Sequence, residues 1–149
     1  MAAPQFFVPP RVTPSNKPKR RFTLEQANRT LPLVSRIVAD IVRVHKNASS
    51  LQGQIEKQDK QQPSKQRTAD IEKELETAKE RLNGLLDELS DVGCELKDFQ
   101  TGLIDFIGRH QNRDVYLCWK LGEAQIGYWH ELDAGFAGRQ PIATLEEKQ

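Results

Sequence analysis

Apolar residues recur every three or four positions along two stretches of this chain. This spacing is typical of amphipathic helices. The first stretch covers residues 24–55 and the second covers residues 71–92. The polar segment 56–65 between them contains Pro63, so we expect the bend there. Two helices with matching apolar seams and a short connection pack antiparallel, which predicts a long, coiled-coil-like helical hairpin.

Both helices carry terminal signals. Thr23 followed by Gln26 has the spacing of a capping box, and it directly precedes the first apolar stretch. Gly93 directly follows the second stretch and suits a helix C-terminus. The hairpin is therefore expected to begin near residue 22 and to end at residue 92.

After Gly93 the pattern changes to short segments of strand type. Strands are predicted at 95–99 and 103–107, separated by a turn at 100–102. The segments 115–121 and 124–130 flank Gly122–Glu123, and glycine first in a two-residue loop favours a type II′ hairpin.

A tight turn at Gly122–Glu123 would also fix which residues face one another. It places Trp119 opposite Ile126 and Val115 opposite His130, and it makes Tyr116 and Trp129 a cross-strand aromatic pair on the opposite face. The face expected to pack on the base of the helical hairpin then carries Val115, Leu117, Trp119, Leu121, Ala124, Ile126, Tyr128 and His130.

These elements predict an α+β fold, with an antiparallel two-helix hairpin followed by a small antiparallel β-rich head. We expect a disordered, Pro-rich basic arm at 1–21 and a single domain at 22–142, divided into the hairpin (22–92) and the head (93–142). A charged tail is expected at 143–149.

Charge is unevenly distributed along the chain. The net charge is +1, but residues 1–21 contain five basic and no acidic side chains. Such an arm can contact nucleic acid, although a solvated tail that aids solubility is the simpler interpretation. We expect a cytoplasmic protein without membrane contact, because no apolar run reaches the roughly 20 residues of a transmembrane helix or forms a signal peptide. Cys94 and Cys118 are interpreted as small buried side chains.

Three blocks of the sequence carry a resemblance to a known family. They are FTLEQANRTLPLV (22–34), GCELKDFQTGLIDF (93–106) and VYLCWKLGEAQIGYWHELDAGFAGRQPI (115–142). Together they resemble the bacterial and archaeal domain-of-unknown-function family 2203. Lys120 stands where that family usually has arginine, and Ile107–Gly108 replaces what is often proline and a small residue. The resemblance supports the architecture and implies no activity.

Polar side chains of the head suggest two candidate sites. His130 and Asp133 are three residues apart, and Asp105 reaches them if its strand is adjacent, which would form a His-and-carboxylate metal site. Against this, the predicted register places His130 on the apolar face, where a buried histidine with one hydrogen-bonded carboxylate is the commoner arrangement. Aromatic side chains with an arginine at the mouth would form an alternative ligand pocket: Tyr116, Trp119, Trp129 and Arg139.

The leading functional expectation is a non-enzymatic interaction or scaffolding protein. A second apolar row in the first helix, Ile37, Val44 and Leu51, has no evident cover within a two-helix seam. This surface suggests docking of a protein partner, or a homodimer that forms a four-helix bundle. The alternative is a metal-binding or small-ligand site in the head around Asp105, His130 and Asp133, with no cofactor required beyond a divalent metal.

Overall fold

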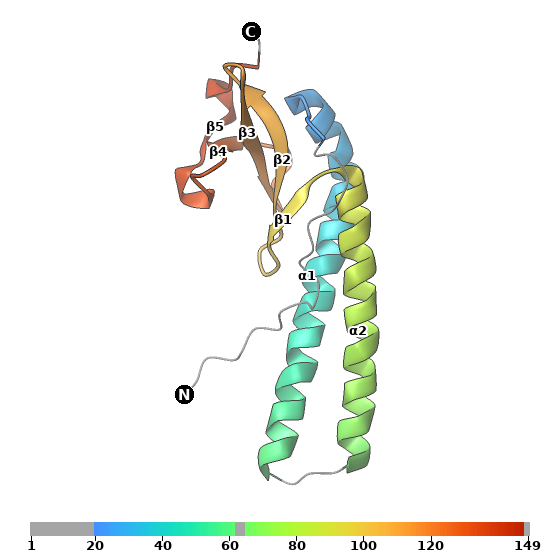
Figure 1. The fold of residues 1–149 in the computed structure, drawn as a ribbon. Coiled ribbons are helices and arrows are strands. Elements are labelled where there is room, and N and C mark those ends of the chain that lie inside the picture. The colour runs from blue at the N-terminus through green and yellow to red at the C-terminus, as the bar shows by residue number, and fades with distance from the viewer. Residues whose placement is uncertain (1–19, 62–64, 148–149) are drawn as a thin grey trace.

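A computed structural model describes residues 20–61 and 65–147 (Figure 1). Two helices form a hairpin, and an antiparallel sheet lies beside the end of the hairpin where the first helix begins and the second ends. The α+β architecture predicted from the sequence is therefore confirmed. Most of the expected basic arm, residues 1–19, lies outside the described residues.

The hairpin consists of α1 (Leu24–Gln61) and α2 (Lys65–Val92). The connection between the helices lies within the predicted segment 56–65, but both helices extend into that segment and are longer than predicted. Glutamate, lysine and glutamine dominate residues 56–61, and these residues favour helix even where they bury little surface. The polar composition of this segment therefore did not mark the end of the helix.

The predicted capping box is confirmed at the start of α1. The Thr23 backbone N–H donates to Gln26 Oε1 at 3.0 Å, and the Gln26 N–H donates to Thr23 Oγ1 at 3.1 Å. A third N–H of this first turn, that of Leu24, donates to the Glu147 carboxylate at 2.8 Å. The C-terminal segment thus stabilises the first turn of α1, where negative charge is also favoured by the helix dipole.

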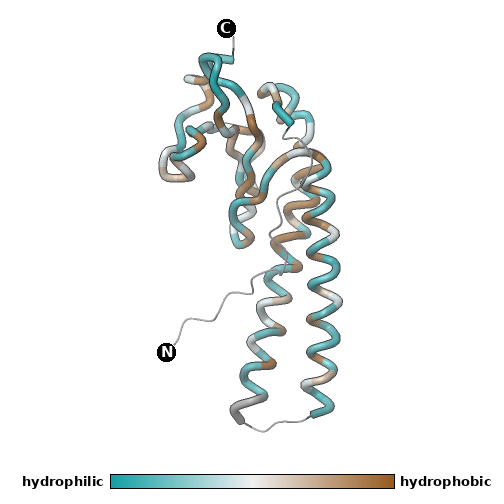
Figure 2. The backbone as a smooth tube through the Cα atoms, in the orientation of Figure 1, coloured by the Kyte–Doolittle hydropathy of each residue, from teal (hydrophilic) through white to brown (hydrophobic). Residues whose placement is uncertain are grey.

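The apolar seams of the two helices face each other, as the brown positions in Figure 2 indicate. Ile37, Val44 and Leu51 are buried at 6 %, 5 % and 5 % exposure, so the row that was expected to lack cover is covered within the chain. The argument for a docking surface built on these residues is therefore wrong. Within the described ranges, neither helix is apolar enough over its length to cross a membrane.

Five antiparallel strands form the sheet in sequence order. Gln111 and Asn112 join the second and third strands with φ angles of 50° and 65°, as a two-residue hairpin turn of left-handed residues requires. Two 3₁₀ turns, η1 (Phe136–Gly138) and η2 (Ile142–Thr144), flank the last strand. The strands are β1 (Glu95–Asp98), β2 (Leu103–His110), β3 (Arg113–Lys120), β4 (Tyr128–Glu131) and β5 (Gln140–Pro141).

The tight turn predicted at Gly122–Glu123 does not join β3 to β4. The Glu123 carboxylate accepts from the Lys120 N–H at 2.7 Å, and the Glu123 carbonyl accepts from Trp119 Nε1 at 2.9 Å. The Ile126 N–H donates to Asn28 of α1 at 2.9 Å, which directs the following residues toward the hairpin. These contacts form a wide loop in place of a two-residue turn.

The wide loop shifts the register between β3 and β4 by one residue. Leu117 lies opposite Trp129, and Tyr116 lies opposite His130. Because neighbouring residues of a strand point to opposite faces, this shift moves Tyr128 and His130 off the helix-facing side and places Trp129 on it. The predicted face is correct for β3 and wrong for β4, and the expected Tyr116–Trp129 pair does not form.

The helix-facing side of the sheet carries Phe106, Leu117 and Trp129, all buried in the core shared with the hairpin. The Phe22 ring packs edge-on against Phe106 with centroids 5.1 Å apart. Truncating a buried ring of this size to alanine typically costs about 3–5 kcal/mol, so these residues anchor the head to the hairpin.

His110 is buried, and its ring stacks on Trp129 with centroids 4.2 Å apart. Its Nδ1 accepts a hydrogen bond from the Glu146 N–H at 2.9 Å. Trp129 Nε1 donates to Thr144 Oγ1 at 2.9 Å. The segment expected to be a charged tail is thus attached to the sheet as far as Glu146, and Glu147 contacts the first turn of α1.

Candidate functional site

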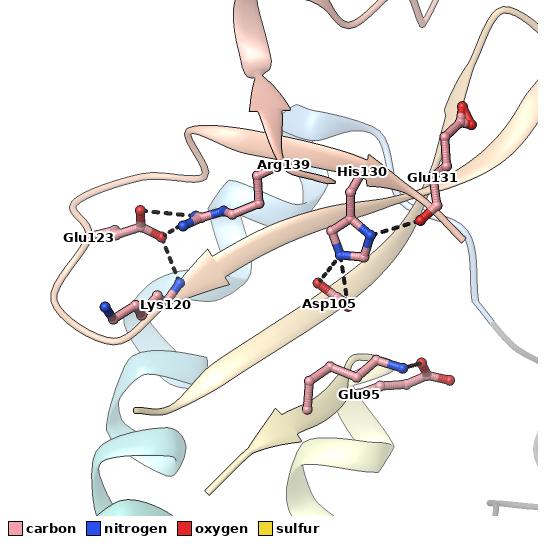
Figure 3. Close-up of polar contacts among 8 residues, drawn as sticks. Glu95, Asp105, Lys120, Glu123, His130, Glu131 and Arg139 are labelled. Atoms are coloured by element: carbon pink, nitrogen blue, oxygen red, sulfur yellow. Dashed lines mark hydrogen bonds and ion pairs between the residues drawn. The ribbon is translucent and has the colours of Figure 1, made fainter. Parts of the chain in front are cut away.

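The sheet face opposite the core carries a compact group of three buried polar side chains. Asp105 on β2 lies directly opposite Cys118 on β3, and His130 on β4 lies two residues further along, opposite Tyr116. Asp105 and His130 are 2 % and 3 % exposed, and Cys118 is fully buried. One carboxylate oxygen, the thiol sulfur and one imidazole nitrogen lie within 4.8 Å of one another. Figure 3 shows His130 pointing toward Asp105.

Hydrogen bonding defines the tautomer of His130. Its Nδ1 lies 2.8 Å from the Glu131 main-chain carbonyl, which only accepts, so Nδ1 carries the hydrogen. In the neutral ring Nε2 then presents a lone pair to Asp105, and in the protonated ring it donates an N–H to it; the two carboxylate oxygens each lie 3.2 Å away. Two acceptors at this distance need a proton or a cation between them.

The surroundings of the group disfavour charge on the free side chains. Burial raises the pKa of the Asp105 carboxyl, and the nearby His130 and Lys97 oppose this rise. Burial also raises the pKa of the Cys118 thiol, to about 12, and the Asp105 carboxylate adds to that rise. A divalent cation would neutralise both side chains and remove this penalty.

The spacing also suits a metal ion. Ligand atoms about 2.1 Å from a tetrahedral zinc lie about 3.4 Å from each other. The 3.2 Å separation between Nε2 and the carboxylate oxygens is close to this value. A histidine that donates its other ring N–H to a main-chain carbonyl is the usual arrangement around metal-ligating imidazoles. The group thus offers three ligands, of types that bind zinc and similar ions.

Two of the three metal ligands predicted from the sequence, Asp105 and His130, are brought together by the fold. The third, Asp133, is exposed in the segment after β4 and lies outside the group. Cys118 takes its place. Sequence reasoning missed it because the assumed register placed Cys118 and His130 on opposite faces. The actual register, with Tyr116 opposite His130, brings them to the same face.

The four residues predicted to line an aromatic pocket do not meet. Trp119 and Trp129 point into the core shared with the hairpin, whereas Tyr116 lies on the opposite face beside His130. Arg139 packs on the Tyr128 ring, with its guanidinium carbon 4.0 Å from the centroid. The hypothesis of one aromatic pocket at these residues has no support in this arrangement.

The reactivity of the two thiols tests directly whether they are buried. Cys94 and Cys118 are both buried free thiols, and burial raises the pKa of each to about 12. Since the thiolate is the reactive form, we expect neither to react with a disulfide reagent at neutral pH in the folded protein. Both should react once the chain is unfolded in denaturant. Rapid labelling of Cys118 in the folded, metal-free protein would contradict this description of the site.

The chain belongs to the family described as "Uncharacterized conserved protein (DUF2203)", whose model matches residues 20–142. The match covers the hairpin and all five strands, including the three residues of the buried group. No match was found among curated proteins or among solved structures.

Proposed function

We propose that the β head of this protein binds one divalent transition-metal ion through Asp105, Cys118 and His130. The observation that carries the proposal is the contact between His130 Nε2 and the Asp105 carboxylate. The buried ring nitrogen and the buried carboxylate face each other at 3.2 Å, and a thiol lies beside them. Cysteine and histidine favour Zn²⁺, Co²⁺ or Fe²⁺ over Mg²⁺ and Ca²⁺, which prefer all-oxygen sites.

Metal binding by matched cysteine variants tests this proposal. The full chain is freed of metal with a chelator and titrated with Co²⁺, whose visible spectrum reports coordination geometry and thiolate ligation. We expect about one equivalent to bind with a thiolate-to-cobalt charge-transfer band, and Zn²⁺ to displace it. Cys118→Ser should lose the band and weaken binding about 100-fold or more, because it removes a ligand.

Cys94→Ser is the control, since Cys94 is also a buried thiol of raised pKa but lies outside the group. It should bind Co²⁺ as the wild type does. Loss of the band in both variants, or in neither, would contradict the proposed ligand set. The absence of binding by the folded wild type would make the Asp105–His130 contact a structural ion pair.

The hairpin has lost the exposed apolar row that motivated its predicted self-association, so a dimer through the hairpin is now the alternative to a monomer. The large apolar side chains that stay exposed in the described ranges lie mainly in the head. They are Leu33, Tyr128, Leu132 and Phe136. Only Leu33 belongs to the hairpin, so we expect a monomer by light scattering unless the head mediates contact. A stable dimer that survives Phe136→Ser and Leu132→Ser would restore the hairpin hypothesis.

A further inference from the structure

The structure also indicates what completes the coordination of the ion, an inference that rests on the metal site proposed above. We propose that the fourth coordination position binds a small oxyanion, such as a carboxylate or phosphate group, and that Lys97 and Arg139 hold it there. Three protein ligands leave one position of a tetrahedral ion open, which is the arrangement of ligand-binding and catalytic sites.

Asp105, Cys118 and His130 lie on the sheet face opposite the core. Glu95, Asp105, Cys118 and Tyr128 are direct neighbours on four consecutive strands and therefore share one face. Figure 3 shows Glu95 on the strand next to Asp105. The metal ligands thus occupy the middle of this face, with Glu95 and β1 on one side and Tyr128 on the other.

On each side of the group, a cationic side chain packs on an aromatic ring. Lys97 Nζ lies 4.7 Å from the centroid of Tyr116, whose ring lies 5.4 Å from that of His130. On the other side, the Arg139 guanidinium packs at 4.0 Å on Tyr128, the neighbour of Cys118. Both cations therefore lie on rings that adjoin the group, Lys97 beside His130 and Arg139 beside Cys118.

The charge of the metal centre and an unpaired donor of Arg139 both favour an anion as the fourth ligand. A divalent ion bound to the Asp105 carboxylate and the Cys118 thiolate forms a neutral centre, so the two flanking cations favour an anionic fourth ligand. Arg139 is engaged only in part: Nη2 donates to both oxygens of Glu123 at 3.1 Å. Its Nε is buried without an acceptor in the described part of the chain, and a buried donor of this kind is costly to leave unpaired.

Glu95 is an alternative fourth ligand to an external anion. A variant at Glu95 therefore distinguishes the two. Its carboxylate lies 3.1 Å from Lys97 Nζ. If an external anion binds, Glu95 competes with it for Lys97, and Glu95→Gln should strengthen anion binding. If Glu95 itself is the fourth ligand, the same variant should weaken metal binding.

The experiment uses the full chain loaded with Co²⁺ in a non-coordinating buffer, titrated separately with acetate and with inorganic phosphate. We expect a saturable change in the visible spectrum with at least one of them. Lys97→Gln and Arg139→Gln should each raise the apparent dissociation constant of the anion about tenfold or more, as loss of a charge-assisted hydrogen bond does. Their Co²⁺ affinity should change much less.

Lys120→Gln is the matched control, because Lys120 lies on the same face of β3 and its loss changes the net charge equally. It should leave the anion affinity unchanged. Circular dichroism establishes that the Arg139 variant is folded, and Lys97→Gln, in a partly exposed side chain, tests the same point with little risk to folding.

The outcomes separate the two proposals. If the folded protein does not bind Co²⁺, the metal site and the anion both fail. If Co²⁺ binds and no anion alters its spectrum, only the inference fails. An equal loss in Lys120→Gln would reduce the effect to net charge, and weaker Co²⁺ binding by Glu95→Gln would assign the fourth position to that residue. Either result would overturn the roles assigned to Lys97 and Arg139.

Discussion

Asp105→Asn is expected to abolish metal binding while leaving the metal-free protein at least as stable as the wild type. Asparagine retains the shape of aspartate, but it offers a much weaker ligand and no negative charge, so Zn²⁺ affinity should fall about 100-fold or more. Most substitutions of a fully buried polar residue destabilise a fold. If Asp105→Asn does not destabilise the metal-free protein, then Asp105 serves metal binding and not stability.

The expected stability of the metal-free Asp105→Asn variant follows from the raised pKa of Asp105. Burial raises the pKa of this carboxyl above its ordinary value of 3.8, so the folded chain holds the proton more tightly than the unfolded chain. Ionisation therefore costs stability as the pH rises from about 3.8 through the folded-state pKa, and the full cost persists above it. The Asp105→Asn variant would avoid this cost, and its new side-chain amide could donate to a lone pair on His130 Nε2.

Thermal unfolding with and without Zn²⁺ measures both effects. At an ion concentration of about 100 times Kd, binding to the folded state alone adds about 2.7 kcal/mol, which for a chain of this size raises Tm by roughly 5–10 °C. The wild type should show this gain, and Asp105→Asn should not. Equal gains in both would exclude Asp105 as a ligand, and a large loss of stability in the metal-free variant would make the Asp105–His130 pair structural.

Sequence patterns predicted the parts of this fold that depend on local periodicity. The apolar spacing from Leu24 onward identified α1, and the Thr23–Gln26 capping box located its start. Both are local signals, since a helix is formed by contacts between residues three and four apart. The same reasoning predicted β1 and β2, although it ended β2 three residues early, before His110.

The sheet register was not accessible in this way, because long-range contacts determine it. The Asn28 side chain of α1, far away in sequence, accepts from the Ile126 N–H and draws the loop away from β3. The residues after Ile126 then pair with β3 in the register that puts His130 on the same face as Cys118. The proposed metal ligands were consequently predicted from residue type alone, which identified Asp105 and His130 but not the thiol that the register brings beside them.

The connection between head and hairpin depends on Gly102, and Gly102→Ala should be among the most destabilising small substitutions in the chain. Its φ of +72° is left-handed, and a Cβ there would lie 2.8 Å from Val38 Cγ1 and 2.9 Å from Leu121 Cβ. The first belongs to α1 and the second to the loop after β3, so all three elements would have to separate. The Gly102 carbonyl also accepts from the Leu121 N–H at 3.0 Å, which limits any adjustment.

Gly122→Ala supplies the matched comparison for Gly102→Ala. Gly122 also has a left-handed φ, +104°, but nothing lies within 4 Å of its added Cβ. It should therefore cost only the backbone strain, about 1–2 kcal/mol. Gly102→Ala should cost a further 1–3 kcal/mol or so for overpacking. Denaturant unfolding of the two variants measures the difference. Equal losses would show that the 100–102 turn can move away from α1, and that the head is held to the hairpin by the Phe22–Phe106 contact and the C-terminal segment instead.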